Sequence, residues 1–339
     1  MEIGLPDSVI KRNSVSYSCN LDIADGQTML DYAVLAQKVG FSAIWASDHF
    51  HPWFHTGAKE TQAWIWLATL LERTKDIPVG TGVTASILRY HPAIIAQAFA
   101  SMEALHGKRV FLTLGAGEAL NELPLGYDWI SLRERRERVA ESAQIVRRLI
   151  SEDFINFSGK HYTLRDANLY MKATLPIYIG ASGPKMAEVV GELGDGFLTI
   201  KGADYAKAEL FPAIERGARK VGKTLDDITK VVEIDVSYHK DFKTALAPLR
   251  TQAGPLIPEM FTDPIYDPRV IERMGSKVTD EEIAKSFVVA QSPEDIIKPV
   301  EAAFNLGFDH VYLASLSPDE GEFIRLCGDK VLPYFKSRM

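Results

Sequence analysis

The sequence predicts a (β/α)8 barrel, in which eight parallel strands form a closed sheet surrounded by helices. Eight short runs of apolar and β-branched residues alternate with longer segments whose apolar residues recur at helical spacing. A strand followed by a crossover helix pairs in parallel with the next strand. The 339 residues are enough for a barrel of about 250 residues with insertions. An open, doubly wound sheet uses the same alternation and stays an alternative.

Each predicted strand is a run of apolar or β-branched residues that ends at a polar residue or a glycine. We expect the strands, in order, at Ser14–Cys19, Ser42–Ala46, Pro78–Val83, Arg109–Leu114, Pro176–Gly180, Gly196–Ile200, Lys230–Tyr238 and His310–Ala314.

The predicted helices follow the strands and carry recognisable end signals. Gly40 is suited to end the first helix, and Pro92 suits a first helical turn. Ser131 and Glu134 have the spacing of a capping box. We expect helices at Gln27–Val39, Thr61–Glu72, from Pro92 onward, and at Ser131–Ile150, Pro184–Leu193, Ala206–Val221 and Asp319–Phe335.

Two stretches interrupt the alternation. Phe154–Leu164 predicts a β-hairpin before the fifth strand, with its turn at Ser158-Gly159. Pro255–Ser286, between the seventh and eighth strands, is long and rich in Pro and Asp, which is typical of a lid or a binding loop. No interdomain linker is apparent, so we expect residues 1–339 to form one barrel domain.

Composition excludes several classes of protein. Hydrophobic residues make up 46% and charged residues 24%, which excludes a disordered or fibrous chain. The net charge of −7 argues against nonspecific nucleic-acid binding. No apolar run approaches a membrane span, and Met1–Asn13 lacks the apolar core of a secretory signal. Two cysteines without a CxxC pair predict a cytoplasmic protein without a disulfide scaffold.

Catalytic groups of barrel enzymes lie at the carboxyl ends of the strands. After the second strand come His49, His51, Trp53 and His55. A histidine with acid/base function beside Trp53 is the favoured interpretation, because the pKa of histidine lies near neutrality. An aromatic loop with exposed histidines is the structural alternative. A zinc site at the three histidines is disfavoured by Pro52 and the absence of a nearby acidic cluster, so we expect no metal.

Three further strand ends carry glycines. Gly80 and Gly82 after the third strand allow a flat ring to approach, or simply weaken the strand. Glu118, which follows Gly117 after the fourth strand, fits either an active-site carboxylate or a structural acceptor; the segment lacks the third glycine of a dinucleotide-binding fingerprint. The fifth strand leads through Gly180–Pro184 into a helix, which favours an anion site at the helix N-terminus over an ordinary turn.

These segments together resemble the luciferase-like barrel superfamily, and within it the oxidoreductases that use the deazaflavin coenzyme F420. Two branches are similar: F420-dependent glucose-6-phosphate dehydrogenases and F420-dependent secondary alcohol dehydrogenases, whose members are commonly homodimers. The resemblance extends from about Ser14 to the end. The motifs that carry it, in the family's order and spacing, are SDHFHPW, RYHPAIIAQAFA, GAGEALNE, GASGP and GDGF.

The resemblance implies roles for individual residues. His49, Trp53 and Glu118 would surround the reactive carbon of the deazaflavin. His49 would exchange a proton with the alcohol oxygen, Trp53 would donate a hydrogen bond to the same oxygen, and Glu118 would serve the deazaflavin side. The remaining implied cofactor contacts are Asp48, Gly82 and Val83 (a bulge that is often a cis peptide), Gly117, Asn121, and the phosphate-binding segment Gly180, Ala181, Ser182, Gly183 and Pro184.

The implied substrate is a secondary alcohol or ketone. The sugar-phosphate branch has an arginine where this chain has Ser286 and a lysine near Asp263, so at most Lys201 remains of three cations. Ile257 and Met260 lie in an apolar loop that suits a small uncharged molecule. Asp22 replaces a glutamate and is one methylene shorter.

Three other functions stay open at this point. They are a sugar-phosphate dehydrogenase of the same family, an FMN-dependent luciferase-type monooxygenase, and a noncatalytic barrel that only binds the cofactor. Two charged segments, Arg89-Tyr90-His91 and Arg133–Arg138, are expected to be exposed to solvent or to lie in an interface.

Overall fold

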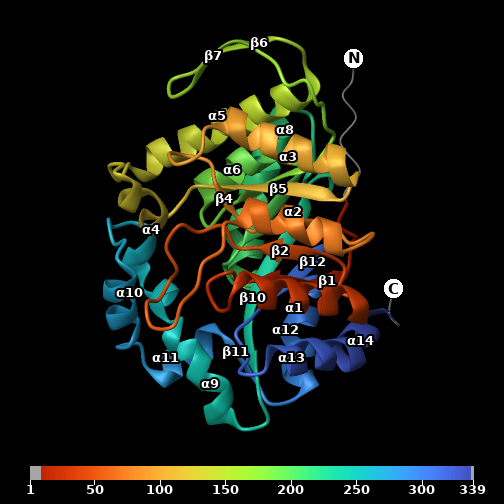
Figure 1. Ribbon diagram of the computed structural model, residues 1–339, viewed down its shortest axis with the longest axis vertical. Helices are drawn as coiled ribbons and strands as arrows, with labels where there is room; N and C mark the ends of the chain where they lie inside the picture. Colours follow the sequence, from red (N-terminus) through yellow and green to blue (C-terminus); the bar gives the residue numbers. More distant parts are fainter. Residues whose placement is uncertain (1–8, 337–339) are drawn as a thin grey trace.

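The computed structural model describes residues 9–336, and their strands close into the predicted parallel barrel (Figure 1). Every strand pair in the barrel is parallel, and the last strand pairs with the first. The order around it is β1 (Ser14–Cys19), β2 (Ile44–Ala46), β3 (Val79–Thr81), β5 (Val110–Gly115), β8 (Ile177–Gly180), β9 (Gly196–Thr199), β10 (Thr229–Tyr238) and β12 (His310–Ser315).

Two short strands extend this sheet. β4 (Thr84–Ala85) pairs with β5, and β11 (Val288–Ala290) pairs with the end of β10. The predicted third strand is therefore too long, because the backbone turns after β3 at a cis peptide bond between Gly82 and Val83.

Helices surround the barrel, and most of them lie where the sequence predicts. Gly40 ends the first helix in the left-handed conformation, with φ at 102°, which a glycine adopts without strain. The Ser131 side chain accepts a hydrogen bond from the Glu134 amide. The main helices are α1 (Gly26–Val39), α2 (Ala63–Arg73), α3 (Pro92–His106), α5 (Leu132–Ser151), α6 (Pro184–Leu193), α8 (Phe211–Lys220), α12 (Pro293–Leu306), α13 (Glu320–Leu326) and α14 (Leu332–Lys336).

The predicted hairpin is present, although its turn lies between Ser158 and Thr163 and its second strand extends to Ala167, and the predicted long loop Pro255–Ser286 instead contains two α-helices. The hairpin of β6 (Ile155–Ser158) and β7 (Thr163–Ala167) is antiparallel and projects beyond the helices at the top of Figure 1. The stretch after β10 holds α9 (Phe242–Thr251), α10 (Pro268–Gly275) and α11 (Asp280–Ser286). The sequence did not predict α9 or α12, and both contain a proline, Pro248 and Pro299, which weakens the helical pattern.

An aromatic cluster fills the barrel interior below its mouth. The Trp45 ring is 4.4 Å from that of Phe111 and stacks on Tyr312 at 5.0 Å between ring centroids. A Cβ atom at Gly80 would overlap Phe111, so this glycine makes room for the cluster rather than for a ligand. Because side chains fill the interior, an active site is expected at the mouth, where the strands end.

Candidate active site

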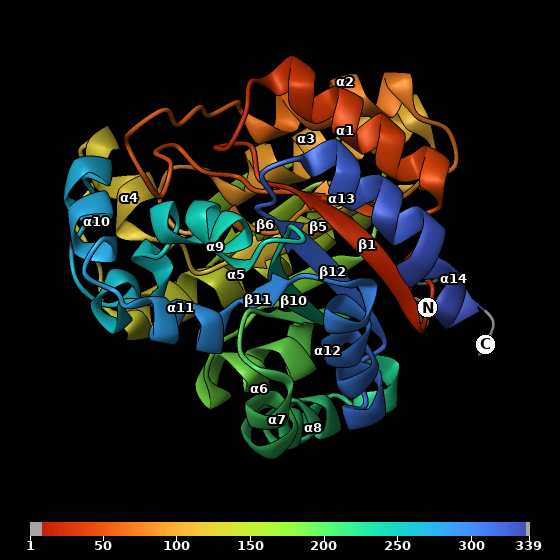
Figure 2. The ribbon, with the colours of Figure 1, turned by 90° about the horizontal axis from the view of Figure 1, so that it is seen from below.

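The candidate site lies at the carboxyl ends of the strands, under the insertion. Figure 2 shows α4 (Ala119–Glu122), α9, α10 and α11 gathered at one end of the barrel. The loop between β2 and α2 reaches the same end. The amides of His55 and Thr56 both donate to the Glu272 carboxylate of α10, at 3.0 and 2.9 Å. This loop and the insertion are thus joined over the mouth.

His49 and Trp53 lie side by side in this loop. Their ring centroids are 6.0 Å apart with the rings perpendicular. The Nδ1 atom of His49 is buried and has no hydrogen-bond partner among the described residues. Burial and the nearby Arg89 lower the pKa of His49 to about 3, so its imidazole is neutral at physiological pH. A neutral imidazole can accept a proton.

Trp53 forms an apolar wall together with the insertion. It is 8% exposed and packs in one cluster with Leu120, Met260 and Ile271. Ile257 packs against the same cluster from its edge. The structure therefore brings the two apolar residues predicted for the substrate pocket to the Trp53 side of the mouth.

Asp48 precedes His49 and is held by a buried ion pair. The Arg89 guanidinium donates to Asp48 Oδ1 at 3.0 Å and to its backbone carbonyl, and both side chains are at most 3% exposed. Thr84 and Trp64 donate to Asp48 Oδ2 at 2.7 and 3.2 Å. Burial raises the pKa of Asp48, and these donors oppose that increase.

The segment after β5 supplies the next acidic groups. Asn121 Nδ2 donates to Glu118 Oε2 at 2.8 Å, and Asn121 Oδ1 accepts from the amide of Phe50 at 2.7 Å. Burial raises the pKa of Glu118 and raises that of Glu122 to about 7. The Arg89 amide donates to Glu122 Oε2 at 2.8 Å. Gly117 has a φ of 66°, a left-handed backbone conformation that is strained for a residue with a side chain.

Asp22 and Glu60 lie on the loops after β1 and β2. Asp22 is 2% exposed, and its Oδ2 accepts a long hydrogen bond of 3.5 Å from the Trp53 amide. Burial raises the pKa of Asp22 to about 6. Burial, with the charges of Asp22 and Asp48, raises the pKa of Glu60 to about 9. Sequence reasoning missed Glu60, because nothing local marks it.

The predicted cofactor segments lie at neighbouring strand ends. The Val83 side chain occupies the space that a Cβ atom at Gly115 would need and is 3.4 Å from such an atom at Gly180. The first turn of α6 has no side-chain cap, and a Cβ at Gly183 would meet no atom within 4 Å. Ala181 is buried and Ser182 is exposed. Free amides and open space at this helix N-terminus suit a phosphate group.

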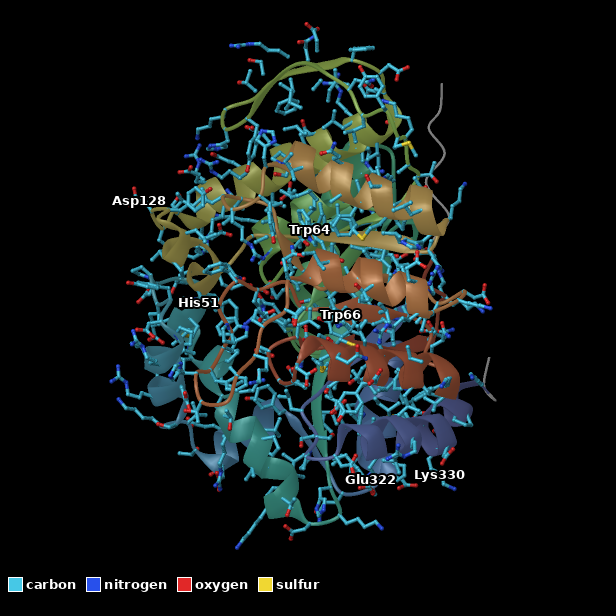
Figure 3. The ribbon with its side chains drawn as sticks, viewed as in Figure 1. His51, Trp64, Trp66, Asp128, Glu322 and Lys330 are labelled. Atoms are coloured by element: carbon cyan, nitrogen blue, oxygen red, sulfur yellow. The ribbon has the colours of Figure 1, made fainter. Side chains whose placement is uncertain are left out.

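Other predicted positions differ from expectation. Ser286 is exposed at the end of α11, and Lys201 is also exposed. His51 lies on the side of the molecule where α10 is drawn (Figure 3), and its Nδ1 contacts the Tyr266 carbonyl at 3.3 Å. Among the described residues, no three or more His, Cys, Asp or Glu side chains are grouped to hold a metal ion.

The expectation that both arginine-containing segments are exposed to solvent or lie in an interface was wrong for Arg89 and Arg135, which are buried within the chain itself. Arg89 is the buried partner of Asp48, which comes to it from a strand end 41 residues earlier. Arg135 is 3% exposed and donates to the carbonyls of Gly117 at 3.2 Å and Phe261 at 2.8 Å, joining α5 to the insertion. The position of Arg89 just after β4 was the available signal.

Comparison with known proteins agrees with this architecture. Residues 12–310 match the family described as luciferase-like monooxygenase. An F420-dependent glucose-6-phosphate dehydrogenase of Microbacterium testaceum is 35% identical over 315 residues, which are 91% of this chain and 94% of the relative. The enzyme of the same description from Mycolicibacterium fortuitum is 35% identical over 319 residues, 92% and 95% of the two chains.

A solved structure is similar over the same length. It is an F420-dependent secondary alcohol dehydrogenase in complex with an F420-acetone adduct, with a TM-score of 0.91 and 34% identity, and the match covers 95% of this chain and 98% of that one. An F420-dependent tetrahydromethanopterin reductase from Methanopyrus kandleri has a TM-score of 0.78 at 21% identity, which shows the shared fold.

Proposed function

This chain belongs to the luciferase-like monooxygenase family, and on that premise we propose that it is a dehydrogenase that exchanges hydride between a secondary alcohol and coenzyme F420. The observation that carries the substrate class is that the buried cation at the mouth is already paired. Arg89 binds Asp48, and Lys201 is exposed. Asp22, with a pKa of about 6, is mainly ionised at pH 7 and would repel a dianionic phosphate, which needs charge-assisted donors.

The residues present fit the cofactor. The unpartnered Nδ1 of His49 and the open N-terminus of α6 leave polar groups available for a ring and for a phosphate. Bound F420 supplies a carbon that accepts or returns hydride. The residues that would hold it are Asp48, Gly82, Val83, Gly117, Asn121, Gly180, Ala181, Ser182, Gly183 and Pro184.

The chain's own residues would handle the proton. The neutral imidazole of His49 takes the hydroxyl proton as hydride leaves the carbinol carbon. Trp53 donates its indole N–H to the same oxygen and, with Met260, excludes water from one side. Glu118, with its raised pKa, can hold a proton on the cofactor side.

One experiment tests this function. Purified protein is mixed with oxidised F420, and loss of its visible absorbance is followed with isopropanol or with glucose 6-phosphate. We expect reduction with isopropanol alone. Reduction with glucose 6-phosphate alone would favour the second candidate, which the names of the curated relatives support. Tight binding of FMN without binding of F420 would indicate a monooxygenase, and F420 binding without turnover of any alcohol would indicate a noncatalytic barrel.

Two further features stay predictions. Both cysteines, Cys19 and Cys327, are buried with free thiols, which agrees with a cytoplasmic enzyme. No helix in residues 9–336 has the length and apolar character needed to cross a membrane. The homodimer is expected from the family resemblance, and light scattering of the purified protein would test it.

A further inference from the structure

Glu60 is a carboxyl group that the reaction described above does not use. Its two carboxyl oxygens are buried and have no side-chain hydrogen-bond partner among the described residues, and a backbone contact with Thr61 offsets little of the effect of burial. Burying an unbonded polar group costs free energy, and burying an unpaired charge costs more. Its raised pKa, about 9, means that Glu60 avoids the second cost by keeping its proton.

Asp22 is the acidic group whose charge acts most strongly on Glu60. The amide of Lys59, the residue before Glu60, donates to the Asp22 carbonyl at 2.9 Å, which places the two loops side by side. The Asp22 charge is the strongest electrostatic influence on Glu60 after burial. With a pKa of about 6, Asp22 is mainly ionised at pH 7 and Glu60 is neutral. The pair therefore presents one O–H donor and one carboxylate acceptor.

Glu60 lies on the same loop as His49 and Trp53, and Asp22 contacts this loop. Asp22 Oδ2 accepts from the amide of Trp53, whose ring borders His49. Glu60 also lines an open cavity of about 590 Å³ between the β2–α2 loop and the start of α10, with His51, His55, Tyr266 and Arg269 on its walls. The link between Glu60 and the reacting groups therefore runs through Asp22, which contacts Trp53 and whose charge acts on Glu60.

We propose that Glu60, together with Asp22, makes this enzyme select secondary alcohols that carry a second hydroxyl group. A hydroxyl accepts from the protonated Glu60 and donates to the ionised Asp22, so it satisfies both. An ammonium group offers no acceptor for the Glu60 proton, and an anion would face the Asp22 charge. This inference rests on the proposed alcohol dehydrogenase function and assigns the substrate class within it.

The test compares 2,3-butanediol with 2-butanol as substrates for F420 reduction. We expect the wild type to have a kcat/KM at least about tenfold higher for the diol, because a site built to bond a hydroxyl rejects the analogue that lacks it. Glu60→Leu should abolish this preference and leave turnover of 2-butanol nearly unchanged. Glu60→Gln, which retains a donor and an acceptor, should keep most of it. Glu281→Leu, an exposed glutamate of α11, is the matched control.

The outcomes separate the two levels of the proposal. Equal kcat/KM values for diol and monoalcohol in the wild type, or a preference that survives in Glu60→Leu, overturn the role of Glu60 alone. A higher kcat/KM for 3-amino-2-butanol than for the diol also overturns it, in favour of a cation site. If no alcohol reduces F420, both this role and the proposed function fail. A larger increase in Tm with the diol than with 2-butanol, in F420-loaded protein, provides a second readout.

Discussion

Asp48 and Glu60 are acidic residues at the two ends of one loop, and they differ in the hydrogen-bond donors that surround their carboxyl groups. Asp48 receives hydrogen bonds from the side chains of Arg89, Thr84 and Trp64, whereas no side chain among the described residues donates to Glu60. A buried carboxylate with a full set of donors fixes the chain around it. A buried carboxyl without donors has bonding capacity left for a ligand. The contrast separates the group that holds the site together from the group that is free to recognise substrate.

The largest effect is expected at His49, the residue that follows Asp48. His49→Ala should lower kcat for alcohol oxidation by about 10²–10⁴, the usual contribution of a positioned acid/base. F420 should still bind, with at most a modest loss of affinity in a fluorescence titration, because the other cofactor contacts remain. His55→Ala, at an exposed position of the same loop, is the control and should retain activity. Unchanged turnover in His49→Ala with cofactor bound would remove His49 from the mechanism.

The pH profile sharpens the same point. Because burial and Arg89 lower the pKa of His49 to about 3, its imidazole is already neutral at pH 5. Alcohol oxidation therefore should not lose rate between pH 8 and pH 5 through protonation of His49, as it would with an ordinary histidine. A loss of kcat/KM centred near pH 6.5 that disappears in His49→Ala would contradict this assignment.

Removing the partner of Asp48 tests the paired side of the comparison. Arg89→Met should lower the free energy of unfolding by about 3–5 kcal/mol, because it leaves Asp48 as an uncompensated buried charge. Urea denaturation measures this value. Arg133→Met removes an exposed ion pair with Glu137 and should cost no more than about 1 kcal/mol. Equal effects for the two variants would show that the Asp48–Arg89 pair does not stabilise the fold.

Glu60→Gln tests the unpaired side through the pH dependence of stability. The folded-state pKa of Glu60, about 9, lies above the ordinary value of 4.5, so the folded protein holds a proton that the unfolded chain releases. Stability from Glu60 is therefore full below pH 4.5 and is lost as pH rises toward 9. Glu60→Gln should lose less Tm between pH 6 and pH 9 than the wild type. Parallel Tm curves would show that Glu60 ionises normally in the folded protein.

The sequence predicted the barrel because each strand and helix carries its own local pattern. The positions of His49, Trp53 and Glu118 at the mouth followed from the rule that barrel sites lie at strand ends. Their chemical roles stay predictions, as does the assignment of residues 1–339 to one domain. Helices α9 and α12 were missed because a proline interrupts each pattern.

The pairing of charges was beyond reach of local patterns. Arg89 looks like a surface residue in its own segment, and its partner Asp48 arrives from another strand end. Glu60 stands out because its buried carboxyl lacks side-chain donors within residues 9–336. This can be seen only once the positions of the surrounding loops are known. The mouth of a barrel brings together residues that are distant in sequence. The sequence therefore indicates candidate residues, but only the structure shows which of them are in contact.

The close approach of Val83 to Gly115 restricts which substitutions relatives can carry at these two positions. The Val83 side chain fills the space that a Cβ atom at Gly115 would occupy. Homologues that keep valine at position 83 should therefore keep glycine at position 115, although Val83 precedes β4 and Gly115 ends β5. Substitutions at these positions should be correlated across homologues, and a Gly115→Ala change should be tolerated far better when Val83→Gly accompanies it.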